Sequence, residues 1–144
     1  MQTAPKRDVV TQYLTTLGHT PQPAYFLDTT FITGWRIALP DFTLEYRLEQ
    51  QRLVICDFQA VGEGKEAARA VMAFIQLIHT LERALPQLRQ VRGMLMDSPY
   101  PQVNQLRLRL SRALIAQGAV WEEHHGERWL VYATGVGKAL TAPV

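Results

Sequence analysis

A glycine-rich turn between two regular segments constrains the fold of this chain most. The turn spans residues 59–64, with the sequence QAVGEG, and it joins a strand-like run at 52–58 to a helix-like run that starts at Lys65. Backbone N–H groups at the start of a helix have no intrahelical partner, and the helix dipole adds positive potential there. The turn therefore predicts a strand-to-helix connection that can hold a phosphate or another anion.

The spacing of apolar residues predicts the order of the elements, because alternation marks strands and three- to four-residue steps mark helices. The expected elements are a helix over 6–17, a turn-rich linker at 19–23, strands at 31–39, 42–48 and 52–58, a helix over 65–85, a strand at 91–96, a helix that starts at 103 and is closed by Gly118, and strands at 119–123 and 128–133. We expect an α+β fold whose mixed, mainly antiparallel sheet carries two main helices.

Length and composition favour one folded domain. The chain has 144 residues, of which 47% are hydrophobic and 19% charged. We expect an N-terminal helix and linker at 1–24, a single α+β domain at 25–134 and a frayed C-terminal tail at 135–144. The single cysteine, Cys56, lies in an apolar strand, which predicts a buried free thiol and a reducing compartment. With no signal peptide and no apolar run long enough to span a bilayer, we expect a cytoplasmic protein that does not associate with membranes.

Positive charge gathers in one part of the chain. Six arginines and one acid, Asp97, lie between positions 83 and 112, although the net charge is only +2. Arg109 and Arg112 lie close together on one predicted helix face, with Arg107 turned away, and arginine forks suit carboxylates. We therefore predict that Arg109 and Arg112 bind an acidic protein partner. The low net charge and the lack of a helix-turn-helix pattern disfavour nucleic acid.

Two adjacent histidines stand beside two acids near the C-terminus. His124 and His125 follow Glu122 and Glu123, so four residues that can bind metals are consecutive. Neighbouring residues of a strand point to opposite faces, and zinc sites usually draw their ligands from separate elements. We therefore predict a hairpin turn here and no metal site.

The segment described first resembles the pyrophosphate loop of a known enzyme family. Strand, Gln-x-x-Gly-x-Gly and helix occur in the order seen in the GNAT superfamily of N-acetyltransferases, whose loop motif is Arg/Gln-x-x-Gly-x-Gly/Ala. The resemblance covers roughly residues 31–133 and implies an acetyltransferase-like half of the fold. It implies that Gln59, Gly62 and Gly64 form an acetyl-CoA site, with the backbone N–H groups of residues 60–65 facing the pyrophosphate and Lys65 nearby.

The chain departs from that family at positions that matter for catalysis. The family commonly has an Asn on a later helix and then a Tyr, four residues before a Gly, that protonates the thiolate; here Asn104 is present, but Leu114 stands four residues before Gly118. Glu63 also puts a negative charge inside the loop. The nearest substitutes are Tyr100 and Tyr132 as acids and Asp57 and Glu63 as bases. We assign no catalytic residue and expect no acyl transfer.

A second resemblance covers the whole chain. Its length, the early Gly34-Trp35 strand, the stretch from 106 to 119 and the closing segment 126–132 together look like the LcrR-type regulators of bacterial type III secretion. This resemblance implies a non-enzymatic cytoplasmic accessory protein that regulates secretion by binding proteins of the apparatus, and it assigns no site residue. That role, without a cofactor, is our first hypothesis; a CoA-dependent N-acetyltransferase is the alternative. The partner, the acyl acceptor and the oligomeric state, a homodimer included, stay open.

Overall fold

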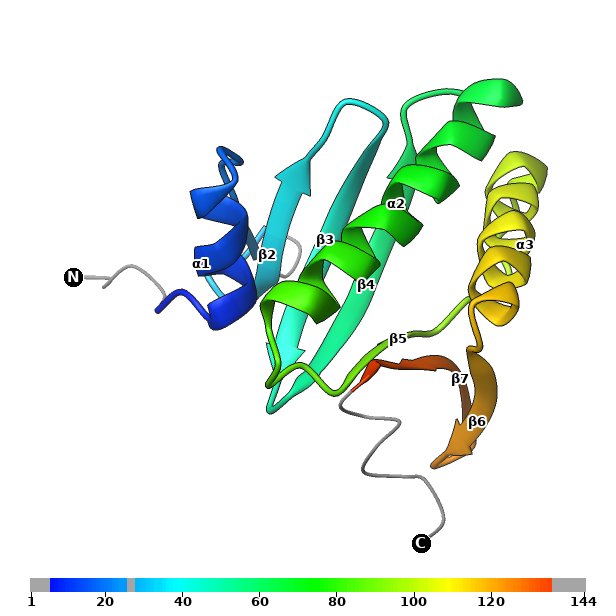
Figure 1. The fold of residues 1–144 in the computed structure, drawn as a ribbon. Coiled ribbons are helices and arrows are strands. Elements are labelled where there is room, and N and C mark those ends of the chain that lie inside the picture. Colours follow the sequence, from blue (N-terminus) through cyan, green and yellow to red (C-terminus); the bar gives the residue numbers. More distant parts are fainter. Residues whose placement is uncertain (1–5, 26–27, 136–144) are drawn as a thin grey trace, which may run out of the picture.

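A computed structural model describes residues 6–25 and 28–135, which form one sheet with helices packed on it (Figure 1). The helices are α1 (Val9–Thr16), α2 (Lys65–Ala84) and α3 (Pro101–Ala116). The strands are β1 (Gln22–Tyr25), β2 (Ile32–Ala38), β3 (Phe42–Glu49), β4 (Arg52–Ala60), β5 (Gln90–Gly93), β6 (Val120–His124) and β7 (Glu127–Ala133). No helix among these residues is long and apolar enough to cross a membrane.

The seven strands lie in the order β1-β2-β3-β4-β5-β7-β6. Every neighbouring pair is antiparallel except β4 and β5, which are parallel and connected through α2. The predicted α+β class and the mixed, mainly antiparallel sheet are thus confirmed. The prediction of a linker at 19–23 is wrong at its end, because Gln22 and Pro23 belong to β1 and pair with β2. Pro23 is tolerated there because β1 is an edge strand.

One face of the sheet carries the helices. Alternation along β3 places Phe42, Leu44 and Tyr46 on this face, where all three are buried. The Tyr46 hydroxyl lies 2.8 Å from the Thr11 hydroxyl of α1, and the Phe42 ring lies 5.8 Å from the Phe74 ring of α2. Figure 1 shows α1 and α2 in front of the sheet, with α3 beside α2. The hydrophobic core therefore forms between this face and the helices.

The opposite face of the sheet is rich in charge. Arg47 and Glu49 of β3 alternate with the core residues, and Arg47 Nε lies 2.6 Å from Glu49 Oε1. Arg36 of β2 lies 4.0 Å from Glu45 of β3 on the same face. We call this side the helix-free face, since the described helices all pack on the other one.

Several predicted boundaries shift by two or three residues. Helix α1 starts at Val9 where 6 was predicted, and β4 runs to Ala60 where 58 was predicted, so that Gln59 and Ala60 belong to the strand and not to the turn. Helix α2 occupies 65–84, and Pro86 follows its C-terminus, as the sequence indicated. Strand β5 is shorter than the predicted 91–96, since it ends at Gly93. The frayed tail expected at 135–144 lies outside the described residues except for Gly135, whose N–H donates to Glu82 Oε2 at 3.2 Å.

Candidate functional site

Strands β4 and β5 pair over half of β4 and then separate. The pairing runs from Arg52 with Gln90 to Ile55 with Gly93, and β4 continues to Ala60 without a β5 partner. Beyond Gly93 the chain turns toward α3 (Figure 1). We call the opening between residues 55–58 of β4 and residues 93–95 the cleft, and the Ile55–Gly93 pair its apex.

A β-bulge in β4 adjoins the apex. Tyr46 of β3 pairs with Ile55, whereas its neighbour Glu45 pairs with Asp57, so that Cys56 is the extra residue. Cys56 is exposed and its sulfur lies 3.8 Å from Arg47 Nη1 on the helix-free face. The prediction that the Cys56 thiol is buried is therefore wrong, because the bulge interrupts the alternation of the two faces along β4.

The cleft is mainly apolar and narrow, with a cavity of about 50 Å³ inside a hollow of about 600 Å³ that includes space open to solvent. Its apolar side chains come from β4, β5, the segment after β5, α2, α3 and β7. They are Ile55, Phe58, Phe74, Val91, Met94, Leu95, Leu110, Leu114 and Leu130. The polar residues that line it are Cys56, Asp57, Arg92, Arg107 and Tyr132. Such a lining suits a slender, mostly apolar chain with a few polar groups.

A second hollow continues from the cleft to the glycine-rich turn. This loop groove, of about 1320 Å³ including space open to solvent, is lined by residues 57–64 and by the N-terminal half of α3. Asp57, Phe58 and Arg107 line both hollows, so the two are contiguous. Together they form one elongated path from the start of α2 to the apex.

The glycine-rich turn lines this groove and has backbone N–H groups without a described partner. The N–H groups of Gly62, Glu63 and Gly64 donate no hydrogen bond to the described residues, whereas the Val61 N–H donates to Asp41 O at 3.0 Å. The prediction that the N–H groups of residues 60–65 all face an anion is therefore wrong for Val61, whose N–H is already bonded. Gly64 precedes α2 with φ 61° and ψ −117°, a backbone conformation open to glycine and few other residues. A cluster of free N–H groups at a helix start can bind an anion.

The structure brings some, but not all, of the predicted cofactor-binding residues to the loop groove. Gln59, Gly62 and Gly64 all line the groove, and Gln59 Nε2 donates to Asp57 Oδ2 at 2.9 Å. Lys65 is exposed and is not among the groove-lining residues. Three of the four predicted cofactor-binding residues thus come together.

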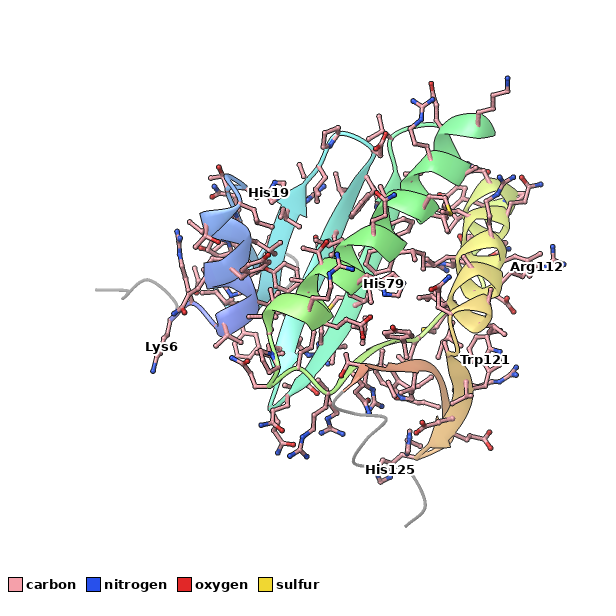
Figure 2. All side chains as sticks on the ribbon, viewed as in Figure 1. Lys6, His19, His79, Arg112, Trp121 and His125 are labelled. Carbon is pink, nitrogen blue, oxygen red and sulfur yellow. The ribbon has the colours of Figure 1, made fainter. Side chains whose placement is uncertain are left out.

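The predicted arginine pair is split. Arg109 lines the loop groove, whereas Arg112 is exposed and projects from the outer side of α3 (Figure 2). Arg107, expected to turn away, lines both hollows, and its Nη1 donates to Met96 O. Its spacing from Val103 and Leu110, by four and three residues, could have placed it on the inner face of α3.

Two carboxylates oppose an anion at the turn. Glu63 lines the groove, and the Glu66 carboxylate lies against the α-carbon of Gly62. Glu66 is also the acid in the first turn of α2, where it offsets the helix dipole. The turn therefore has the donors of an anion site and a negative charge of its own beside them.

The cleft lacks a well-placed proton donor among the described residues. Leu114 lines the cleft, four residues before Gly118, where the GNAT motif has a tyrosine. Tyr132 also lines it, but its hydroxyl donates to Glu82 Oε1 at 2.8 Å, and burial together with the Glu82 carboxylate raises the pKa of Tyr132 to about 12. Tyr100 is 61% exposed and does not line the cleft. Neither tyrosine is thus placed as a free proton donor inside the cleft.

Asn104 forms hydrogen bonds to the loop that follows β5. Its Oδ1 accepts from the Ser98 N–H and its Nδ2 donates to Ser98 O, both at 2.8 Å. These two bonds fix the loop that leaves the cleft after β5, and they occupy both ends of the amide. Asn104 therefore holds the loop at Ser98, a residue that lines the loop groove.

The histidine-rich segment forms the predicted turn. His125 and Gly126 connect β6 to β7 with φ of 53° and 78°, as a two-residue hairpin turn requires. His124 Nε2 lies 2.8 Å from Glu122 Oε1 on β6. Within residues 6–25 and 28–135, no group of three His, Cys, Asp or Glu side chains could hold a metal ion.

Comparison with known proteins gave no match to a family model, to a curated protein or to a solved structure.

Proposed function

We propose that the cleft and the loop groove bind a coenzyme A thioester without transferring its acyl group. The observation that carries this proposal is the separation of β4 from β5, which opens a mainly apolar cleft that leads to three free N–H groups at the start of α2. A coenzyme A thioester has matching parts in the same order: a pyrophosphate, a slender pantetheine arm and an acyl end. The proposed ligand is that of the alternative hypothesis from the sequence, a CoA-dependent N-acetyltransferase. The prediction that no acyl group is transferred is kept.

Each part of the ligand has a counterpart along the path. The pyrophosphate would accept hydrogen bonds from Gly62, Glu63 and Gly64, with Arg109 in the same groove to balance its charge. The pantetheine arm would lie between β4 and the segment after β5, where the strand edge offers backbone groups for its amides. The acyl end would then lie at the apex, near Ile55 and Gly93.

Calorimetry with acetyl-CoA tests the proposal, with two variants at Gly62 as matched probes. Gly62→Asp places a third carboxylate at the turn and should abolish binding. Gly62→Ala also displaces the Glu66 side chain but adds no charge, so it should retain most of the affinity. If millimolar acetyl-CoA gives neither heat nor a shift in melting temperature with the wild type, the turn is only a structural connection.

A second candidate function is the protein-binding regulator of type III secretion. The observation that favours it is the outward position of Arg112, which a partner's carboxylates can reach without entering the groove. Arg112→Glu should weaken co-purification with the native partner and leave acetyl-CoA binding unchanged, whereas Arg109→Glu should weaken acetyl-CoA binding. Unchanged co-purification with Arg112→Glu would remove this surface from consideration.

A further inference from the structure

Arg92 of β5 is a charged residue at the apex of the cleft, and it has no ion-pair partner among the described residues. It precedes Gly93, the last residue that β5 pairs with β4, and it lines the cleft. Its Nε is buried and has no hydrogen-bond partner, and its guanidinium forms no ion pair with the residues the structure describes. A buried donor that is left unpaired is costly, and a bound anion would relieve that cost.

The surroundings of Arg92 hold its side chain in place. Its neighbour Val91 is buried beneath the helices, so alternation directs Arg92 to the helix-free face. There its guanidinium stacks over the Trp129 ring of β7, with 4.2 Å between Cζ and the ring centroid. Stacking on an aromatic ring leaves the in-plane N–H groups free to form a fork around a carboxylate. The site is therefore preorganised for a planar anion.

The acid that lines the cleft does not pair with Arg92. Asp57 is the one carboxylate among the cleft-lining residues, and its Oδ2 accepts from Gln59 Nε2 at 2.9 Å. No ion pair joins Asp57 and Arg92 within 4.0 Å in the described part of the chain. The positive charge of the Arg92 guanidinium is therefore available to a ligand at the apex.

We infer that the acyl group held at the apex ends in a carboxylate, which binds Arg92. The inference rests on the proposed binding of a coenzyme A thioester and names the class of that ligand: thioesters of short dicarboxylic acids, such as succinyl, malonyl or glutaryl groups. An acetyl group has no carboxylate that could form an ion pair with Arg92. A glutaryl group extends the same apolar chain by a few carbons and places a planar carboxylate beyond it.

The test compares glutaryl-CoA with pentanoyl-CoA, which has the same chain length but no carboxylate. By calorimetry, wild type should bind glutaryl-CoA about tenfold or more tightly, the size expected for a charge-assisted pair. Arg92→Gln should abolish that preference, and Arg92→Lys should keep part of it, since the charge stays while the fork is lost. The control is Arg128→Gln, because Arg128 also stacks on a tryptophan of the sheet, Trp121 at 4.4 Å, but does not line the cleft.

The outcomes separate the inference from the proposed function. Tighter binding of glutaryl-CoA that survives in Arg128→Gln and disappears in Arg92→Gln supports the inference. Equal binding of the two thioesters by wild type overturns it while leaving the proposed function intact. A preference for glutaryl-CoA that persists in Arg92→Gln also overturns it. If neither thioester binds, the proposed function fails and the inference with it.

Discussion

The Glu66 carboxylate of α2 lies against the α-carbon of Gly62, in the space that a side chain at position 62 would occupy. The protein thus holds a negative charge of its own beside the free N–H groups of the turn. Glycine at position 62 makes that approach possible, because any Cβ there would displace the carboxylate. A ligand's phosphate must either push Glu66 aside or accept its repulsion.

Glu66→Gln should therefore strengthen binding of coenzyme A. Removing one unit charge a few ångströms from a phosphate at this exposed site is worth about 1 kcal/mol, or roughly fivefold in affinity, at low salt. The gain should shrink as salt is added. Calorimetry at two salt concentrations measures it, with Glu123→Gln on β6 as a control at a distant exposed glutamate. Weaker binding by Glu66→Gln would show that Glu66 helps the ligand.

The sequence was sufficient to predict the class of the sheet and every element except β1, because the signals for these features are local. Alternating apolar residues define β2 and β3, and the stripe that includes Phe74 defines α2. The turn at Gly62 and Gly64 was also predictable, since glycines between a strand and a helix have few other uses. Strand β1 was missed because it contains Pro23, which ordinarily disfavours a strand.

The details of the site depend on relationships that no local pattern contains. The bulge that exposes Cys56 follows from how β4 pairs with β3. The opening of the cleft depends on where β5 stops pairing with β4, at Gly93. Arg92 was not distinguished from the other arginines, because its missing partner is visible only when the strands around it are assembled.

Alkylation of Cys56 should report on occupation of the cleft. The thiol is exposed and lines the cleft, and it is the only cysteine, so iodoacetamide has one target. Partial burial raises the pKa of the Cys56 thiol, although Arg47 opposes this effect. Since only the thiolate reacts, alkylation at pH 7.5 should be slower than that of glutathione and should accelerate as the pH rises.

Saturating acetyl-CoA should slow this alkylation several-fold, because the pantetheine arm would cover the bulge. Mass spectrometry of the intact protein follows the single modification over time. Desulfo-CoA is a useful second ligand, since it cannot exchange with the thiol. An unchanged rate with ligand bound would mean that the arm does not reach Cys56.

Glu82 should make the stability of the fold depend on pH in the acidic range. Burial acts to raise the pKa of Glu82, but hydrogen bonds from His79, Tyr132 and the Gly135 N–H outweigh it and lower the pKa below its ordinary value of 4.5. A lowered folded-state pKa stabilises the fold above the unfolded value, and this stabilisation is lost as the pH falls through the folded value.

Urea unfolding at a series of pH values tests this linkage. The stability difference between wild type and Glu82→Gln should be largest near pH 6 and should narrow as the pH falls below about 4.5, the ordinary pKa. Glu123→Gln, at an exposed position on β6, should follow wild type throughout. A difference that does not change with pH would mean that the hydrogen bonds of Glu82 matter but its charge does not.

The chain should bind acetyl-CoA without turning it over. Acyl transfer needs an acid to protonate the departing thiolate, and Leu114 cannot supply a proton where it lines the cleft. Tyr132, with its pKa raised to about 12, is a weaker acid than ordinary tyrosine, and its hydroxyl already donates to Glu82. Because general acid–base assistance is typically worth ~10²–10⁴ in rate, its absence leaves at most a feeble reaction. Chromatographic measurement of free coenzyme A, across a panel of amines and peptides, should show release at the background rate. Steady release that disappears in Tyr132→Phe or Tyr100→Phe would instead establish an acyltransferase and identify its proton donor.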